Sequence, residues 1–476
     1  MAVIDVGSNS VRMVMHEVRG RAMTPSFNEK ILAGLGRGLP DTGRLNPEGV
    51  ALALSALGRF AAINRAQKCD EVIAFATAAV REAEDGREFV ELVRRRTGLE
   101  LRILSGDEEA RCAAQGVLAG SPDVDGVVGD LGGSSMELAR VVGGKFVSGA
   151  TFPLGPLRNG ADGGFSEDKV LDRARAALAG ADELAHGHSV FFAVGGAWRA
   201  IAAIHMQVAK APLHMLQNYE MSASDLVSLL KELAGGKKHA SLVNQLAKRR
   251  APTIPYASTV LRAVLEEGKF QTVMVSSFGV REGMVFETLS DAERLEDPLE
   301  AGLAAYVEPD SPSCQFGRAL GDWIDPAADH LLPARLARAA CRLVDIGALL
   351  HPDHRADLAF ELVARAPLPG LTHKDRAALA LAVAARYKRG VRSAVSDALL
   401  DADVAKRARS LGALMRLGAE FSGRSASLLR HASLHCDGQT IEFRVAPRQS
   451  VLVSESVERR LQQASEELGM SHILTT

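Results

Sequence analysis

The sequence predicts an α/β protein with a duplicated N-terminal half, followed by a helical domain and a small α/β cap. The duplication rests on an apolar strand that runs into an acidic, glycine-rich turn, at residues 2–10 and again at 126–137. Beyond about residue 300 the pattern changes to alanine- and leucine-rich helical periodicity. We therefore predict domains at 1–122, 123–300, 301–430 and 431–476.

The elements of the duplicated half follow from alternating apolar residues and helical periods. In order, we expect strands at 2–6, 11–17 and 30–32, a helix at 49–64, a strand at 71–76, a helix at 86–97 and a strand at 101–104. A second strand meander is expected at 126–130, 137–142 and 145–152. The two acidic turns would then face each other across a cleft between domains, a common place for ligand sites.

These turns, 5–10 (DVGSNS) and 130–137 (DLGGSSME), combine a carboxylate with small residues. Small residues let backbone N–H groups approach an anion closely, and the carboxylate can face a cation. One such turn alone is more often structural. A third acidic cluster, 105–111 (SGDEEAR), follows a strand and opens a helix with Ser105 or Asp107 as N-cap. Together the three segments supply what phosphoryl hydrolysis needs: anion positioning, metal ligands and a residue that orients water.

With 76–83 (ATAAVREA), these segments resemble the exopolyphosphatase and guanosine pentaphosphate phosphohydrolase family, within the sugar kinase, Hsp70 and actin superfamily. The resemblance runs the length of the chain. It implies two actin-like (ribonuclease H-like) domains, a C-terminal all-α HD-like domain and a small α/β cap. It also implies a homodimer that removes the terminal phosphate of inorganic polyphosphate.

The resemblance assigns roles to single residues. Glu109 matches the catalytic glutamate that directs water, and Arg81 matches an arginine that meets a phosphate oxygen. Asp130 and Glu137 match acidic ligands of Mg²⁺ or another divalent cation, and Asp5 is expected to join them. The residues expected to cradle phosphates are Gly7, Ser8, Asn9, Ser10, Gly132, Gly133, Ser134 and Ser135.

The second turn departs from the family loop, which runs Asp-x-Gly-Gly-Gly-Ser-Thr-Glu. Here Ser134 replaces the third glycine and Met136 replaces the threonine. A side chain at 134 restricts the loop if that position needs a positive φ, which favours glycine.

Two further segments are possible contacts of a nucleotide or substrate. The segment 191–199 (FFAVGGAWR) gives Gly195, Gly196 and Arg199, although a tight strand-to-helix connection would explain it equally well. Arg281, in a later turn, could reach the substrate or serve only as an ion-pair partner.

The motifs do not separate polyphosphate from guanosine pentaphosphate, so a guanosine pentaphosphate 5′-phosphohydrolase is the alternative. A less favoured alternative is a sensor of polyphosphate or of guanosine penta- or tetraphosphate, with catalysis weakened by the altered loop.

Composition predicts an ordinary soluble enzyme, with 47% hydrophobic residues, 24% charged residues and a formal net charge of −2 over 476 residues. No apolar run reaches the roughly 20 residues of a membrane helix, so we expect a cytoplasmic protein with no membrane partner. The near-neutral charge argues against nucleic acid. Basic clusters at 94–96, 248–250 and 406–409 are interpreted as solvated faces. The five cysteines are far apart, which predicts neither a zinc site nor a disulfide framework.

In the C-terminal part we expect helices at 332–350, 355–366 and 374–387. Asp345, His351 and His354 invite comparison with HD hydrolases, but no adjacent His-Asp pair is present, so a metal-free scaffold is favoured. Asp437-Gly438 predicts a hairpin of strands 433–436 and 439–445, and a final helix is expected at 454–468.

Overall fold

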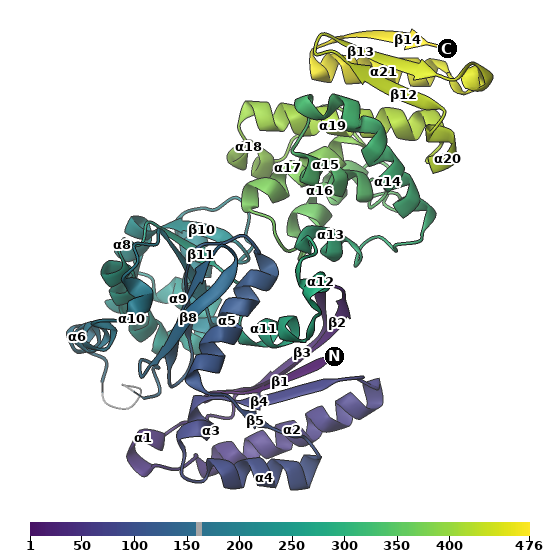
Figure 1. The fold of residues 1–476 in the computed structure, drawn as a ribbon. Helices are drawn as coiled ribbons and strands as arrows, with labels where there is room; N and C mark the ends of the chain where they lie inside the picture. The colour runs from purple at the N-terminus through teal and green to yellow at the C-terminus, as the bar shows by residue number, and fades with distance from the viewer. Residues whose placement is uncertain (159–163) are drawn as a thin grey trace. The chain divides into compact units, whose positions relative to one another are not determined.

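The computed structural model describes residues 1–158 and 164–476, which form two compact units, Met1–Pro298 and Leu299–Thr476 (Figure 1). The finer division into four domains stays a prediction.

The first sheet of the N-terminal unit has five strands in the order β3-β2-β1-β4-β5. Its strands are β1 (Ala2–Val6), β2 (Val11–Arg19), β3 (Ala22–Ile31), β4 (Val72–Ala76) and β5 (Arg102–Ile103). The first three form an antiparallel meander, and β4 and β5 continue the sheet in parallel to β1. The predicted meander is confirmed, with a much longer third strand.

The second sheet has six strands in the order β10-β11-β9-β6-β7-β8. Its strands are β6 (Gly126–Leu131), β7 (Met136–Val142), β8 (Lys145–Phe152), β9 (Val190–Val194), β10 (Tyr219–Ser222) and β11 (Thr272–Val275). An antiparallel meander is again extended by two parallel strands, and β10 adds an antiparallel edge strand. The same plan therefore occurs twice, as the duplicated turns predict.

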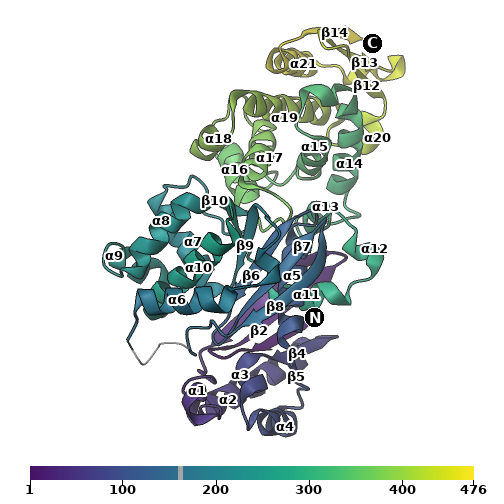
Figure 2. The same ribbon diagram turned by 60° about the vertical axis from the view of Figure 1, so that its left-hand side comes forward.

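Two helices lie between the sheets, α5 (Gly106–Gly120) and α11 (Val280–Thr288), as both views show (Figures 1 and 2). Glycines let them approach: a Cβ added to Gly116 would lie 2.2 Å from the Gly279 carbonyl oxygen, and one added to Gly283 would lie 1.8 Å from the Cys112 carbonyl oxygen. This packing fixes the N-terminus of α5 beside the ends of β1 and β6.

The outer faces of the sheets are covered by other helices. Leu57 and Phe60 of α2 (Pro47–Gln67) and Val93 of α4 (Gly86–Thr97) bury the outer face of the first sheet. The second sheet is covered by α6 (Glu167–Leu178), α7 (Gly196–Val208), α8 (Ala223–Ala234), α9 (Ala240–Ala247) and α10 (Ile254–Gly268). Shorter helices are α1 (Leu39–Thr42), α3 (Ala78–Glu82) and α12 (Asp291–Arg294).

The C-terminal unit is a helical bundle with a three-stranded sheet. Its helices are α13 (Pro298–Leu303), which begins at the boundary, α14 (Pro312–Ile324), α15 (Ala334–Arg342), α16 (Arg355–Arg365), α17 (His373–Ala385), α18 (Ala394–Leu399), α19 (Ala402–Ser422), α20 (Ala426–Leu429) and α21 (Glu455–Leu468). The predicted hairpin is confirmed as β12 (Ala432–Cys436) and β13 (Thr440–Val445). A strand that sequence reasoning missed, β14 (Ser471–Thr475), runs parallel to β13.

The prediction of one helix over 332–350 is wrong in its second half, because α15 ends at Arg342. The Tyr387 hydroxyl donates to the Val344 carbonyl oxygen at 2.8 Å and accepts from the Gly347 N–H at 3.0 Å. These tertiary hydrogen bonds replace helical ones over the turn that follows α15.

Among the described residues, no helix combines the length and the apolar character needed to cross a bilayer.

Candidate active site

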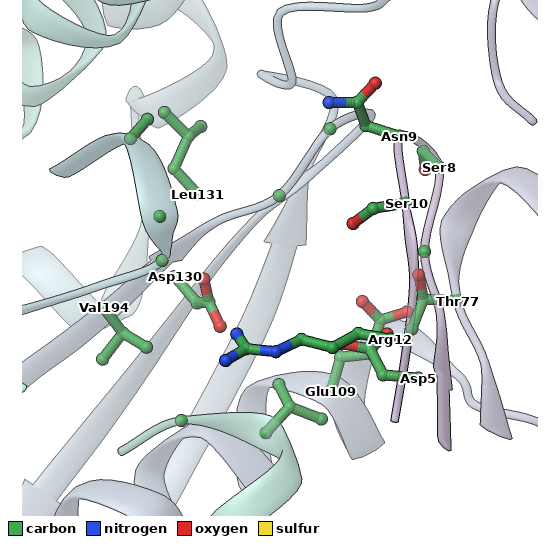
Figure 3. Close-up of a pocket in the computed structure, with 18 of the residues that line it drawn as sticks. Asp5, Ser8, Asn9, Ser10, Arg12, Thr77, Glu109, Asp130, Leu131 and Val194 are labelled. Carbon is green, nitrogen blue, oxygen red and sulfur yellow. The ribbon is translucent and has the colours of Figure 1, made fainter. Parts of the chain in front are cut away.

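A pocket of about 210 Å³ opens where β1 and β6 end, and both acidic turns line it (Figure 3). The turns touch: a Cβ added to Gly133 would lie 3.1 Å from the Ser8 Cβ. Asp5, Glu109 and Asp130 come from three elements and line the same pocket (Figure 3). The structure thus brings together the three segments that the sequence singles out.

The same backbone hydrogen bond occurs within each of the two turns. The Gly7 N–H donates to the Ser10 carbonyl oxygen at 3.0 Å, and the Gly132 N–H donates to the Ser135 carbonyl oxygen at 2.9 Å. The duplication therefore extends from strand order to single atoms, and each turn is held by its own backbone.

Glu109 enters the pocket from the first turn of α5. Ser105 caps this helix, since its hydroxyl accepts from the Glu108 N–H at 3.2 Å and its own N–H donates to Glu108 Oε2 at 2.8 Å. Glu108 is thus a structural capping residue. Glu109 is buried, and its carboxylate is paired with Arg81 of α3, whose guanidinium also donates to the Leu104 carbonyl oxygen at 2.6 Å. Arg81 holds Glu109 and does not itself line the pocket.

The buried carboxylates repel one another. Burial, and then the charge of Glu137, raises the pKa of Glu109, and the Arg81 guanidinium opposes that rise. Burial likewise raises the pKa of Glu137, although hydroxyls of Ser135 and Thr151 face its carboxylate, with Thr151 Oγ1 donating to Oε1 at 2.9 Å. Burial raises the pKa of Asp130 to about 6. These three desolvated carboxyl groups therefore favour the uptake of a proton or of a nearby cation.

Asp5 has a partner of its own. Arg281 Nη1 donates to Asp5 Oδ2 at 2.9 Å, and Glu282 lies beside the same guanidinium. Both side chains of this pair line the pocket. Arg281 therefore anchors Asp5 in the structure.

Gly195, Gly196 and Arg199 also reach the pocket. Gly195 has a φ of 93°, and a Cβ there would lie 2.7 Å from Asp130 Oδ1, so glycine is required to admit that carboxylate. Arg199 donates to the Ser277 carbonyl oxygen at 2.8 Å.

The altered second turn is accommodated without left-handed backbone at Ser134. Ser134 and Ser135 are buried and do not line the pocket, whereas Gly132 and Gly133 do. Met136 points into the hydrophobic core of the second sheet. The concern about a positive φ at residue 134 is thereby resolved.

Sequence reasoning missed Arg12, Lys30 and Arg250, which also line the pocket. Arg250 lies in the 3₁₀ helix Lys248–Thr253, and a Cβ at Gly196 would lie 2.0 Å from its Nη2. The interpretation of 248–250 as a solvated face is therefore wrong for Arg250, because its guanidinium packs against the turn before α7.

Strand register explains why Arg12 and Lys30 line the pocket. Asp5, Arg12 and Lys30 stand side by side across β1, β2 and β3. Asp130, Glu137 and Thr151 form the matching row across β6, β7 and β8. One copy of the fold thus supplies cations where the other supplies acid and hydroxyl groups. Pairing the predicted strands outward from each turn could have placed these residues beside the acidic turns.

Two duplicated sheets, each with a glycine-rich acidic turn at one shared pocket, define the actin-like class of phosphate-handling folds. Profile comparison assigns residues 13–292, more than half of the chain, to the Ppx/GppA phosphatase family. The chain belongs to this family. Residues 328–474 match a second profile, described as the C-terminal domain of exopolyphosphatase.

Curated relatives and solved structures agree with this family assignment. The chain is 32% identical over 161 residues to exopolyphosphatase 1 of Mycobacterium tuberculosis. This aligned stretch covers 33% of this chain and 47% of that protein. The match to exopolyphosphatase 1 of Mycobacterium leprae is also 32% identical and covers 48% of it. The chain thus matches about half the length of these curated relatives.

Crystal structures of the Aquifex aeolicus Ppx/GppA family member and of a Cytophaga hutchinsonii exopolyphosphatase share the fold. Their TM-scores are 0.53 and 0.54 at 22% and 20% identity, over 60% and 61% of this chain and 96% and 98% of theirs. At this identity the likeness establishes the fold.

Proposed function

We propose that the protein is an exopolyphosphatase that hydrolyses the terminal phosphate of inorganic polyphosphate. The observation that carries this proposal is the pocket itself. A buried glutamate held by an arginine faces two glycine turns, and unpaired cations stand in the same pocket. This is the arrangement that attack of water on a phosphoanhydride requires.

Glu109 is the proposed base. Its raised pKa makes the ionised carboxylate a stronger base toward the attacking water, and Arg81 fixes its orientation. The water oxygen forms a bond to the terminal phosphorus, its proton goes to Glu109, and the bridging P–O bond breaks. The products are orthophosphate and a polyphosphate shorter by one phosphate. The N–H groups of the two turns would bind the phosphoryl oxygens.

The pocket fits a divalent cation. Within residues 1–158 and 164–476, no group of three or more His, Cys, Asp or Glu side chains is placed to hold a metal ion. Mg²⁺, however, commonly takes one or two carboxylates together with substrate phosphates and water. The desolvated carboxylates of Asp130 and Glu137 are suitable ligands, and Asp5 stands nearby with one oxygen held by Arg281. When bound, the cation would neutralise charge on the phosphoryl oxygens.

Two features of the pocket favour a polyanion over a nucleotide. Lys30 and Arg250 line it, and neither side chain makes a hydrogen bond or an ion pair with the rest of the described chain. Free cations at this depth suit consecutive phosphates. Among the described lining residues, Phe75 alone is aromatic, and it is buried, so a guanine base would find little to stack on.

The test is release of phosphate from long-chain polyphosphate and, in parallel, from guanosine pentaphosphate, with Mg²⁺ and with chelator. E109Q is the test variant. E108Q is its matched control, because it makes the same change one residue away, outside the pocket, and glutamine retains the capping role.

Metal-dependent release from polyphosphate that is lost in E109Q and kept in E108Q would support the proposal. Preference for guanosine pentaphosphate would move the assignment to the nucleotide hydrolase. Binding of either substrate without release would make the protein a sensor, and release that is unchanged in E109Q would remove Glu109 from the mechanism.

Three further parts of the proposal rest on the resemblance. We place the protein in the cytoplasm, which suits its five unpaired cysteines. We expect a homodimer, which light scattering tests, and an HD-like origin for the C-terminal helices, which their crystal structure would test.

A further inference from the structure

A cavity of about 650 Å³ lies within the C-terminal unit, lined by residues at the start of α15, at the start of α17 and at the junction of α18 and α19. Its lining is mostly apolar, and the apolar residues include Leu331, Leu332, Leu336, Ala378, Leu400 and Val404. Small-molecule sites have volumes of roughly 300–1,000 Å³ and are lined mainly by apolar side chains. The cavity therefore has the size and the lining of a binding site.

The walls of this cavity are held in place by the chain itself. Leu331 and Leu336 are 2% and 6% exposed, so the core of the unit anchors them. Arg407 of α19 joins two walls, because its Nε donates to the Asp403 carboxylate at 2.7 Å and its Nη1 donates to the Asp329 carbonyl oxygen at 3.1 Å. A ligand would therefore meet a preformed cavity, which lowers the cost of binding.

The polar part of the lining is acidic. Four carboxylates stand against two cations, which gives a formal net charge of −2. The charged lining residues are Asp329, Asp375, Asp401, Asp403, Lys374 and Arg407. Arg407 is the partner of Asp403, so this pair cancels. The remaining lining charges are three carboxylates and one ammonium group.

Two of these three carboxylates cap helices. Asp375 accepts from the Thr372 N–H at 3.0 Å, and Asp401 Oδ1 accepts from the Val404 N–H at 2.9 Å. Capping satisfies the helix ends and leaves the negative charges in place. The third carboxylate, Asp329, is exposed and makes no hydrogen bond or ion pair with any residue that the structure describes. Asp329 is thus the lining acid that is free to meet a ligand.

We propose that this cavity binds an organic cation, with an aliphatic or aromatic body inside the cavity and an ammonium group beside Asp329. Transfer of the apolar body out of water would drive binding. The net negative charge of the lining would select a cation over an anion with the same body. The exposed Lys374 opposes this selection and is outnumbered by the carboxylates. This proposal does not rest on the proposed hydrolysis.

The test is calorimetric titration of the full-length protein with three amphiphiles that share one alkyl chain. Octyltrimethylammonium, octanol and octanoate differ only in the charge of the head group, and each is kept below the concentration at which it aggregates. V404W is designed to fill the cavity, and A402W adds the same side chain to α19 at an exposed position outside the lining. D329N removes the free carboxylate, and D325N makes the same change nearby, outside the lining.

We expect affinity to fall from the ammonium compound to the alcohol and from the alcohol to the carboxylate. D329N should weaken binding of the ammonium compound about fivefold, the effect of an exposed ion pair, and should leave octanol unchanged. K374Q should strengthen binding of the ammonium compound. V404W should abolish binding of all three compounds, whereas A402W and D325N should bind like the parent.

Equal affinity for the three compounds, or a preference for octanoate, would overturn the proposal of a cation. Unchanged binding in V404W would place the compounds outside the cavity, and the absence of binding by any of them would likewise overturn the proposal. If V404W lowers the melting temperature, A334W replaces it, because Ala334 is an exposed lining residue at the start of α15. The readout needs no hydrolysis, so its result is independent of the activity of the first unit.

Discussion

Arg12 on β2 and Lys30 on β3 are direct register partners, so two cations stand opposite each other on neighbouring strands. Like charges placed directly opposite in a sheet are destabilising. Arg250 and Arg281 add to the positive charge around Lys30. Repulsion of this kind, at the wall of a pocket, is expected where a polyanion binds.

The first prediction concerns pH. Burial, and then the charges of Arg250, Arg12 and Arg281, lowers the pKa of Lys30 to about 8. Lys30 therefore loses its charge as the pH rises through about 8, and the apparent KM for polyphosphate should rise about tenfold, the value of one charged hydrogen bond. K30R, which keeps its charge, should abolish the rise in a KM profile from pH 7 to 9.

The same shift affects stability. Below pH 8 Lys30 is charged in both states, so the folded protein carries the full penalty of the buried charge. That penalty is relieved between about 8 and the ordinary value of 10.5. Relative to K30M, the parent should gain unfolding free energy over that range. A constant difference would contradict the lowered pKa.

The second prediction concerns Gly196. A methyl group there would overlap the Arg250 guanidinium, so G196A should displace Arg250 and raise KM about tenfold, with less effect on kcat. Because both changes act through one side chain, G196A and R250A should be non-additive. G58A is the control: its Cβ meets nothing within 4 Å in the middle of α2, and it should stabilise the protein by about 0.5–1 kcal/mol.

Sequence reasoning succeeded where the signal is local. The strand at Ala2–Val6, the helix at Gly86–Thr97 and the Ser105 cap follow from periodicity and capping chemistry. It failed where distant residues decide. The Tyr387 hydroxyl holds the turn after α15 through its hydrogen bonds to Val344 and Gly347. The position of Arg250 depends on packing against Gly196. Both acidic turns were found because a strand followed by a carboxylate and glycines is a pattern of neighbouring residues.

The third prediction concerns the pair Asp5 and Arg281, whose side chains are 22% and 14% exposed. R281Q leaves Asp5 uncompensated near Asp130 and should cost about 3 kcal/mol of unfolding free energy. D5N should cost less, because Glu282 still faces Arg281. Urea unfolding in a W323F background, in which Trp198 reports the N-terminal unit, measures both. R94Q breaks the exposed pair with Glu91 and should change stability by less than about 1 kcal/mol.

The fourth prediction concerns thiol reactivity. Burial raises the pKa of Cys112 to about 12, and Cys314 and Cys341 are also buried. Only the thiolate reacts with alkylating agents, so these three should react only after denaturation. Cys69 and Cys436 are partly exposed and should react in the native protein. Mass spectrometry after brief alkylation distinguishes the two sets, and early labelling of Cys112 would mean that α5 and α11 separate readily.

The last prediction concerns the departure from the family loop. Because Ser134 avoids left-handed backbone, S134G should leave kcat/KM within twofold and should cost about 0.5–1 kcal/mol through added freedom of the unfolded chain. M136T should be worse, by about 2–3 kcal/mol, because Met136 is fully buried beside Leu138 and Phe152 in the core. Restoring the family residues one at a time therefore weakens this protein. A gain in kcat/KM for S134G, measured with polyphosphate, would instead show that Ser134 restrains the turn that binds phosphate.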